Sequence, residues 1–204
     1  MWGGEGGGCK GVNIFDPHHM ILAPTHSHTL FFPPQIVVAD ITARVAAIVA
    51  DTGVREGVVT LLSKHTTVGL TINEWESRLA RDVEAWLLSL APPDDRSTAG
   101  TPGRGVRYAH NDIDQRPGDG DERERCLQNG WAVDAVDGPR GLAAWRAQEP
   151  INAHSHLLAM LLGASEAVPV SGGRMTIGQW QSLLMVDTDG PRERTVGVQV
   201  MGYK

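Results

Sequence analysis

The sequence predicts a chain of helices and antiparallel strands, and two patterns carry this prediction. Apolar residues recur at helical spacing over residues 40–51 and 75–90. The C-terminal part is instead a succession of β-branched runs separated by turns, in which Val196, Val198 and Val200 alternate with less apolar residues. Such alternation is typical of a half-buried antiparallel strand.

Composition narrows the class of protein. With 204 residues, of which 41% are hydrophobic, the chain can bury one core, with or without a large insertion, and this composition argues against disorder of the whole chain. The formal net charge of −6 argues against a nucleic-acid partner, and no apolar run approaches the roughly 20 residues of a membrane span, so we expect no membrane partner. Two cysteines argue against a disulfide framework, so we expect the cytoplasm, with an organelle as the alternative.

The N-terminal part begins with a segment rich in glycine. Residues 1–11 lack the apolar stretch of a secretory signal, and we predict that residues 1–24 form a flexible extension. A single domain is expected over 25–204, opening with strands at Ser27–Phe32 and Ile36–Ala39.

The first helix is predicted to begin at Asp40 or Thr42, whose side chains can cap it, and to run to about Asp51. Gly53 is a natural C-terminal stop. A short apolar strand, Val58–Leu62, is expected next.

The segment Lys64–Glu74 follows that strand and gathers a histidine, three threonines, an asparagine and a carboxylate. We expect these polar groups together at a strand end, where chemistry tends to sit. Asn73 and Glu76 form a capping box for the next predicted helix. The apolar stripe of that helix comprises Trp75, Leu79, Val83, Trp86, Leu87 and Leu90.

Residues 116–149 are rich in Gly, Asp, Arg and Pro, and no clear element is predicted there. A connection of this length is usually functional or mobile, and we predict an insertion that covers part of the surface. Its charged run at 119–125 is predicted to be a solvated loop.

Beyond the insertion, Asn152–Leu162 is predicted to be a helix that Gly163 ends. Asp189-Gly190, between two apolar runs, predicts a β-hairpin, and Trp180 is expected to pack in the core. The strands predicted in this part are Ala167–Val170, Arg174–Ile177, Trp180–Asp187 and Thr195–Met201.

Three histidines, His65, His110 and His156, are candidate metal ligands. Three neutral imidazoles can hold a borderline metal and leave a position for water or substrate. Their long spacing is no metal signature, and three structural histidines are the alternative.

Other polar side chains are candidates for catalysis or substrate binding, each with a structural alternative. Glu74 could act as a general acid or base or as a fourth, carboxylate ligand, or only as a carboxylate favoured at a helix N-terminus. Thr66, Thr67 and Asn73 could donate hydrogen bonds to an oxyanion, or only satisfy turn and cap groups.

Further candidates come from later segments. Gln181 could present its amide to a ligand, and Asn111 with Asp112 could add oxygen ligands for Mg²⁺, or form a solvated turn. Arg192 could clamp a phosphate or carboxylate, or form a turn or subunit salt bridge, whereas Arg194 is expected at the surface.

Several of these motifs together resemble the YjbQ family, also called UPF0047. The resemblance covers roughly Ser27 to Gly202 apart from the insertion, although Asp187 stands where a glutamate is common. The motifs that carry it are His65-Thr66-Thr67 to Asn73-Glu74, Tyr108-x-His110-Asn111, Asn152-Ala153-x-Ser155-His156, Trp180-Gln181 and Asp189-Gly190-Pro191-Arg192.

The resemblance implies an α+β fold with a β-sandwich-like antiparallel core, assembled as a homotrimer. It also implies a pocket near subunit contacts in which His65, His110 and His156 hold a divalent metal, Zn or Mg. Family members are often labelled secondary thiamine-phosphate synthases, which join a pyrimidine diphosphate to a thiazole phosphate and release pyrophosphate.

Two hypotheses on function follow. The first is a metal-dependent transferase for a small phosphorylated or anionic metabolite, with Glu74 as acid or base; a hydrolase of unknown substrate fits the metal ligands as well. The second is a non-catalytic trimer that binds a metal or metabolite. Under the first, the substrate-binding residues are Thr66, Thr67, Asn73, Gln181 and Arg192.

Overall fold

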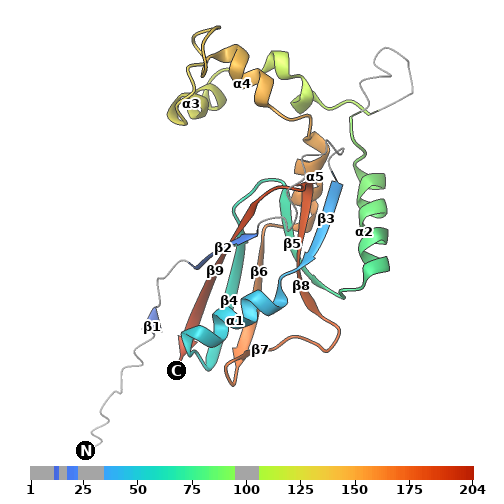
Figure 1. Ribbon diagram of the computed structural model, residues 1–204, viewed down its shortest axis with the longest axis vertical. Coiled ribbons are helices and arrows are strands. Elements are labelled where there is room, and N and C mark those ends of the chain that lie inside the picture. Colours follow the sequence, from blue (N-terminus) through green and yellow to red (C-terminus); the bar gives the residue numbers. More distant parts are fainter. Residues whose placement is uncertain (1–11, 14–17, 23–34, 95–105) are drawn as a thin grey trace, which may run out of the picture. The chain divides into compact units, whose positions relative to one another are not determined.

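The computed structural model of the chain describes residues 12–13, 18–22, 35–94 and 106–204 (Figure 1). The predicted strand Ser27–Phe32 lies outside these residues. The chain divides into two compact units. The first comprises Met1–Leu87 and Leu158–Lys204, and the second comprises Leu88–Leu157.

The described part of the first unit contains two sheets whose strands all pair antiparallel. The larger sheet has the order β1-β9-β4-β6-β7, with β2 also paired to β9, and the smaller has the order β3-β8-β5. The strands are β1 Val12–Asn13, β2 His18–Leu22, β3 Gln35–Asp40, β4 Glu56–Ser63, β5 Val68–Asn73, β6 Ser165–Ser171, β7 Arg174–Met175, β8 Ser182–Gly190 and β9 Arg194–Tyr203.

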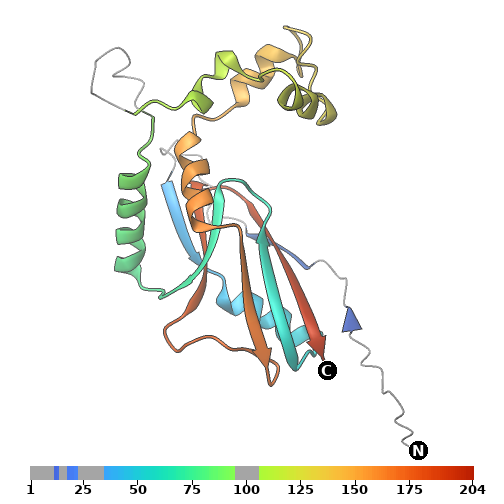
Figure 2. The same ribbon diagram turned by 180° about the vertical axis from the view of Figure 1, so that it is seen from behind.

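One hydrophobic core joins both sheets and helix α1, Thr42–Thr52 (Figures 1 and 2). The helix contributes Val45 and Val49 to this core, together with side chains from β4, β5, β6, β8 and β9. The predicted helix is therefore confirmed, and Gly53 ends it in the left-handed conformation with φ 70°. The α+β class with a sandwich-like antiparallel core is confirmed as well.

The predicted hairpin at Asp189-Gly190 is wrong. Strand β8 pairs with β3 on one edge and with β5 on the other, so neither edge is open to β9. After Gly190 the chain passes to the other sheet, where β9 pairs with β4. The residues of β8 from Leu183 to Gly190 are all buried, as expected of a central strand.

Trp180 does not pack in the core, contrary to the sequence prediction. Its side chain is 71% exposed. Strand β8 begins only at Ser182, and a turn in which the Gln181 amide donates to the Gly178 carbonyl (3.0 Å) precedes it. Trp180 therefore stands on the connection between β7 and β8.

The segment Lys64–Glu74 also differs from the prediction, because most of it is strand β5. Asn73 is the last residue of β5 and caps no helix. Helix α2, Ser77–Leu90, is capped instead by Glu76, the residue before it. The Glu76 carboxylate accepts hydrogen bonds from the main-chain amides of Arg78 and Leu79, both at 2.9 Å. On the predicted apolar stripe, Leu87 is buried, whereas Trp75, Trp86 and Leu90 are exposed.

Four short helical elements lie wholly within the described part of the second unit. The predicted insertion includes two of them, and its charged run forms helix α3 instead of a loop. Trp145 and Val133 are buried in this part, and the guanidinium carbon of Arg116 lies 5.4 Å from the centre of the Trp145 ring. The elements are η2 Ala109–Asn111, η3 Ile113–Gln115, α3 Asp121–Gln128 and α4 Leu142–Gln148.

Helix α5, Ala153–Leu162, confirms the last predicted helix, and Gly163 follows it with φ 88°. Both α2 and α5 contain a boundary between the two units. None of the described helices combines the length and the apolar character needed to cross a membrane.

Candidate functional site

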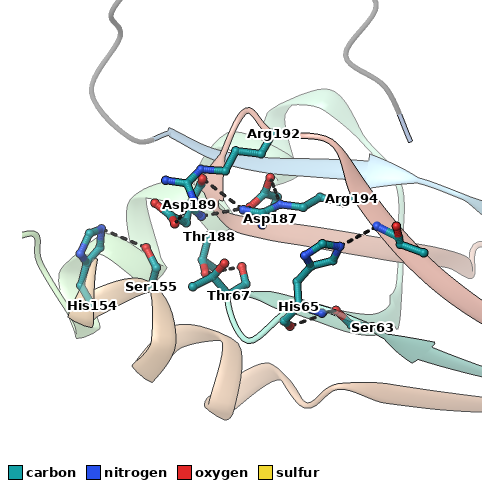
Figure 3. Close-up of polar contacts among 11 residues, drawn as sticks. Ser63, His65, Thr67, His154, Ser155, Asp187, Thr188, Asp189, Arg192 and Arg194 are labelled. Carbon is teal, nitrogen blue, oxygen red and sulfur yellow. Dashed lines mark hydrogen bonds and ion pairs between the residues drawn. The ribbon is translucent and has the colours of Figure 1, made fainter. Parts of the chain in front are cut away.

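His65 lies in the short connection between β4 and β5, and its main chain is held by the end of β4 (Figure 3). The Ser63 hydroxyl accepts from the His65 amide at 3.3 Å and donates to the His65 carbonyl at 3.2 Å. The Lys64 amide donates to the Thr195 carbonyl on β9 at 3.1 Å. This connection is therefore fixed to both neighbouring strands.

The imidazole of His65 is fixed through one nitrogen. Its Nε2 accepts a hydrogen bond from the main-chain amide of Thr195 at 2.8 Å. Burial, and next the charge of Arg194, lower the pKa of His65, against an opposing effect of Asp187. Geometry and environment both favour the neutral ring with its proton on Nδ1.

Beside His65, a buried ion pair joins the end of β8 to the start of β9 (Figure 3). Arg194 donates from Nε to Oδ2 of Asp187 at 2.8 Å and from Nη2 to Oδ1 at 2.6 Å. It also donates to the Asp189 carbonyl at 3.1 Å. The prediction that Arg194 lies at the surface is therefore wrong, because both ends of this bidentate pair are buried.

Arg192 lies outside that buried pair. Its side chain is 50% exposed, and its Nη1 lies 3.2 Å from Oδ2 of Asp189. This is the turn salt bridge that the sequence offered as one alternative for Arg192. The exposed half of the guanidinium still leaves donors for an anion.

Thr66 and Thr67 share the His65 end of β5. Thr67 is buried, and its carbonyl accepts from the amide of Thr188 at 3.0 Å and from the Thr188 hydroxyl at 2.8 Å. Its main chain therefore has a structural part, whereas Thr66 is exposed.

Asn73 and Glu74 lie at the other end of β5. The six residues of this strand separate them from Thr67 by about 20 Å, at about 3.4 Å per residue. Both side chains are exposed, and Asn73 Oδ1 accepts from the Glu74 amide at 2.8 Å. Gln181 lies at this same end, next to Ser182, which pairs with Asn73.

The residues predicted as one polar cluster in the first unit therefore form two groups. His65, Thr66, Thr67 and Arg192 lie at one end of the smaller sheet, and Asn73, Glu74 and Gln181 lie at the opposite end. The alternation of a strand hidden inside Lys64–Glu74 was the signal that could have separated them: Leu70 and Ile72 stand two apart.

His110 and His156 belong to the second unit, where the structure brings them together. Their ring centroids are 4.8 Å apart, and the rings meet edge to face with an interplanar angle of 69°. Burial, and next the charge of Arg116, lower the pKa of His110, while Glu122 and the side chain of Asn152 act to raise it.

Asn111 holds this pair in place and is the residue whose role sequence reasoning missed. Its side chain is fully buried (0% exposed), and its Oδ1 accepts from the amide of Ala153, the first residue of α5, at 3.0 Å. Its Nδ2 donates to Asp94 Oδ2 at 2.9 Å. Asn111 therefore ties the turn that carries His110 to the first turn of α5, which carries His156.

The oxygen ligands suggested by the sequence serve other contacts. Asn111 makes the two bonds just described, and Asp112 forms an ion pair with Arg107 at 2.7 Å. In the part of the chain that the structure describes, no three His, Cys, Asp or Glu side chains are grouped so that they could hold a metal ion. The histidine pair is therefore at most part of a ligand set.

Comparison with known proteins gives a consistent picture. The family model described as UPF0047 protein YjbQ-like matches residues 28–203. A UPF0047 protein of Methanothermobacter thermautotrophicus is 32% identical over 168 residues, which cover 82% of this chain and 85% of the relative. Another, from Archaeoglobus fulgidus, is 30% identical over 173 residues and covers 85% and 98%.

Solved structures show the same fold. A hypothetical protein of Aeropyrum pernix K1 is 26% identical with a TM-score of 0.60, covering 92% of this chain and 98% of that one. A YbjQ-like protein of unknown function from Sulfolobus solfataricus P2 is 24% identical with a TM-score of 0.56, covering 90% and 94%. Neither description states an activity.

Proposed function

Because the chain belongs to the YjbQ (UPF0047) family, we propose that it is a metal-dependent enzyme for a small phosphorylated or anionic metabolite, and that His110 and His156 bind its divalent metal. The observation that carries the proposal is the pairing of these two rings, 4.8 Å apart. Two imidazoles bound to one tetrahedral ion at about 2 Å have their ring centres about 5 Å apart. The pair therefore has the separation that shared coordination requires.

The surroundings of the pair support this assignment. Asn111, itself buried, fixes both segments by hydrogen bonds, so the two rings are brought together before any ion binds. The Asn152 side chain acts to raise the pKa of His110.

Two imidazoles also bear on which metal binds. Nitrogen ligands suit zinc and similar borderline ions better than Mg²⁺, which prefers oxygen. Glu122 is close enough to act on the pKa of His110, but its oxygens already accept from Arg116 and from the Gly118 amide. The remaining positions are therefore assigned to water, to the ligand or to a partner subunit.

His65 does not fit the metal set that the sequence suggested. Its Nε2 lone pair is taken by the Thr195 amide, and the proton of the neutral ring is then on Nδ1. A metal bound to His65 would require the loss of either the hydrogen bond from Thr195 to Nε2 or the proton on Nδ1. We therefore leave His65 out of the ligand set.

An anionic ligand is the second half of the proposal. The divalent metal ion would stabilise the negative charge of phosphoryl oxygens or activate a bound water. The thiamine-phosphate synthase reaction is one candidate within this class, because both of its substrates carry phosphate. Within the first unit, Arg192 and Thr66, exposed at one end of the smaller sheet, are the side chains we assign to binding an anionic group.

A non-catalytic metal-binding protein is the second candidate. The position of Glu74 favours it, because β5 separates this carboxylate from His65 and Thr66 within one chain. An acid or base must lie within hydrogen-bond reach of the reacting group. Under this alternative the metal would serve assembly or sensing, and no turnover would be found.

The test of metal binding is elemental analysis of purified protein. We expect a stoichiometric divalent metal in the wild type, a clear loss in His110→Ala and in His156→Ala, and full retention in His65→Ala, which is the matched control. Unchanged metal in both single variants would overturn the ligand assignment. Pyrophosphate release from the two thiamine precursors, measured on the metal-loaded protein, would show catalysis and exclude the non-catalytic candidate.

A further inference from the structure

We propose that His65 binds an oxyanion of the ligand through its Nδ1–H, and that the main chain of Thr195 fixes the imidazole in the tautomer that makes it a donor. The inference rests on the anionic ligand of the proposed function and deepens it. It gives His65 a role independent of the metal.

The tautomer follows from the chemistry of the bond. A main-chain amide can only donate, so the Nε2 atom 2.8 Å from the Thr195 nitrogen must accept with its lone pair. A neutral imidazole has one N–H, which is then on Nδ1. None of the described residues accepts a hydrogen bond from this atom, so its proton is available to a bound ligand.

The donor is held rigidly on both sides. Thr195 cannot turn away, because its carbonyl accepts from the Lys64 amide and the preceding residue, Arg194, is clamped by buried Asp187. The main chain of His65 is held by Ser63, which bonds both its amide and its carbonyl, and its ring is held by the bond to Thr195. A hydrogen-bond donor fixed before the ligand arrives loses little conformational freedom on binding.

The charge around His65 favours an anion. Lys64 and Thr66, its neighbours in the chain, are both exposed and are both donors. Asp187 is neutralised by Arg194, so its carboxylate does not repel an anion from this end of the sheet. Arg192 adds a half-exposed guanidinium at the same end.

If His65 had a purely structural role, only its Nε2, which accepts from Thr195, would matter. Two variants separate this role from that of the Nδ1–H donor. In His65→Gln the amide oxygen can accept from Thr195, but no N–H stands at the Nδ1 position. In His65→Asn an amide N–H stands near the Nδ1 position, but the bond to Thr195 is lost. We expect His65→Gln to keep the thermal midpoint of unfolding and to lose anion affinity. We expect His65→Asn to have a lower thermal midpoint and to keep part of the anion affinity.

The binding experiment measures, by titration calorimetry, the affinity of chelator-treated protein for inorganic pyrophosphate. A hydrogen bond to a charged group corresponds to about a tenfold or larger change in affinity. We therefore expect His65→Gln to bind pyrophosphate at least about tenfold more weakly than the wild type. Equal affinity in the two proteins would overturn the proposal.

Nitrogen NMR of the histidine rings gives a readout that needs no variant to bind anything. The His65 signals, identified by their loss in His65→Gln, are expected to show a protonated Nδ1 and a bare Nε2. A protonated Nε2 would refute the tautomer whatever the two variants bind. Because the metal is removed beforehand, failure here and failure of the metal assignment are distinguishable.

Discussion

At the scale of single residues, we expect the buried ion pair of Asp187 and Arg194 to contribute strongly to the stability of the first unit. It joins the last buried residues of one sheet to the first residue of the next strand in the other. Removing one partner of a buried ion pair leaves an uncompensated charge, and this costs far more than losing a surface pair.

We predict that Arg194→Met lowers the free energy of unfolding by about 3–5 kcal/mol, because Asp187 is left buried and unpaired. Arg192→Met is the matched control, since its salt bridge is half exposed, and we expect about 1 kcal/mol or less. Urea denaturation of both variants measures the difference. Similar losses in both would show that the buried pair has no special weight.

His65 predicts a dependence of stability on pH. Its pKa in the folded protein is held below the ordinary 6.5, so the unfolded chain binds a proton at a higher pH than the folded chain does. Stability is therefore unaffected well above pH 6.5 and falls as the pH drops from there towards the folded pKa. The comparison is of unfolding free energies at about pH 8 and about pH 5. We expect a smaller drop in His65→Gln, and an equal drop would contradict the shift.

At the scale of elements, structure that depends on neighbouring residues could be predicted from the sequence, whereas structure that depends on distant strands could not. Helix α1 could be predicted because its apolar spacing and Gly53 all lie within a dozen residues. The connection after Asp189-Gly190 could not, because the turn signal is local, whereas the pairing of both edges of β8 depends on β3 and β5, far away in the sequence.

The candidate site shows the same limit. Histidine is a recognisable metal ligand at both positions 110 and 156, but the 45 intervening positions give no physical reason to join them, and only the resemblance does so. The bond from Asn111 to the start of α5 is what brings them together, and a lone buried asparagine has no periodic pattern that would reveal it. Likewise, Arg194 could be placed only once Asp187 was known to face it.

We predict that Asn111→Ala loosens this arrangement. It leaves the Ala153 amide and Asp94 without their buried partner, and we expect about 1–3 kcal/mol less stability. Metal content is expected to fall as well, because His110 is no longer held beside His156. Gln115→Ala, on the exposed neighbouring turn, is the control and is expected to change neither. Full metal content in a folded Asn111→Ala protein would show that the tie is dispensable.

At the scale of the whole molecule, we predict self-association into a trimer. Large apolar side chains stand exposed on α5, among them Met160 at 79% and Leu161 at 61%, and exposed apolar surface favours association. Sedimentation is expected to give three times the 22.0 kDa of one chain. A monomer over the whole concentration range would contradict this expectation.

The length of β5 has a consequence for genetics. His65 and Glu74 lie at opposite ends of this strand, so a single ligand of small size cannot contact both within one chain. Any reaction that uses both must take one from each of two chains. Two defective alleles, one altered at each position, would then restore some active sites when expressed in the same cell, whereas a chain altered at both would rescue neither.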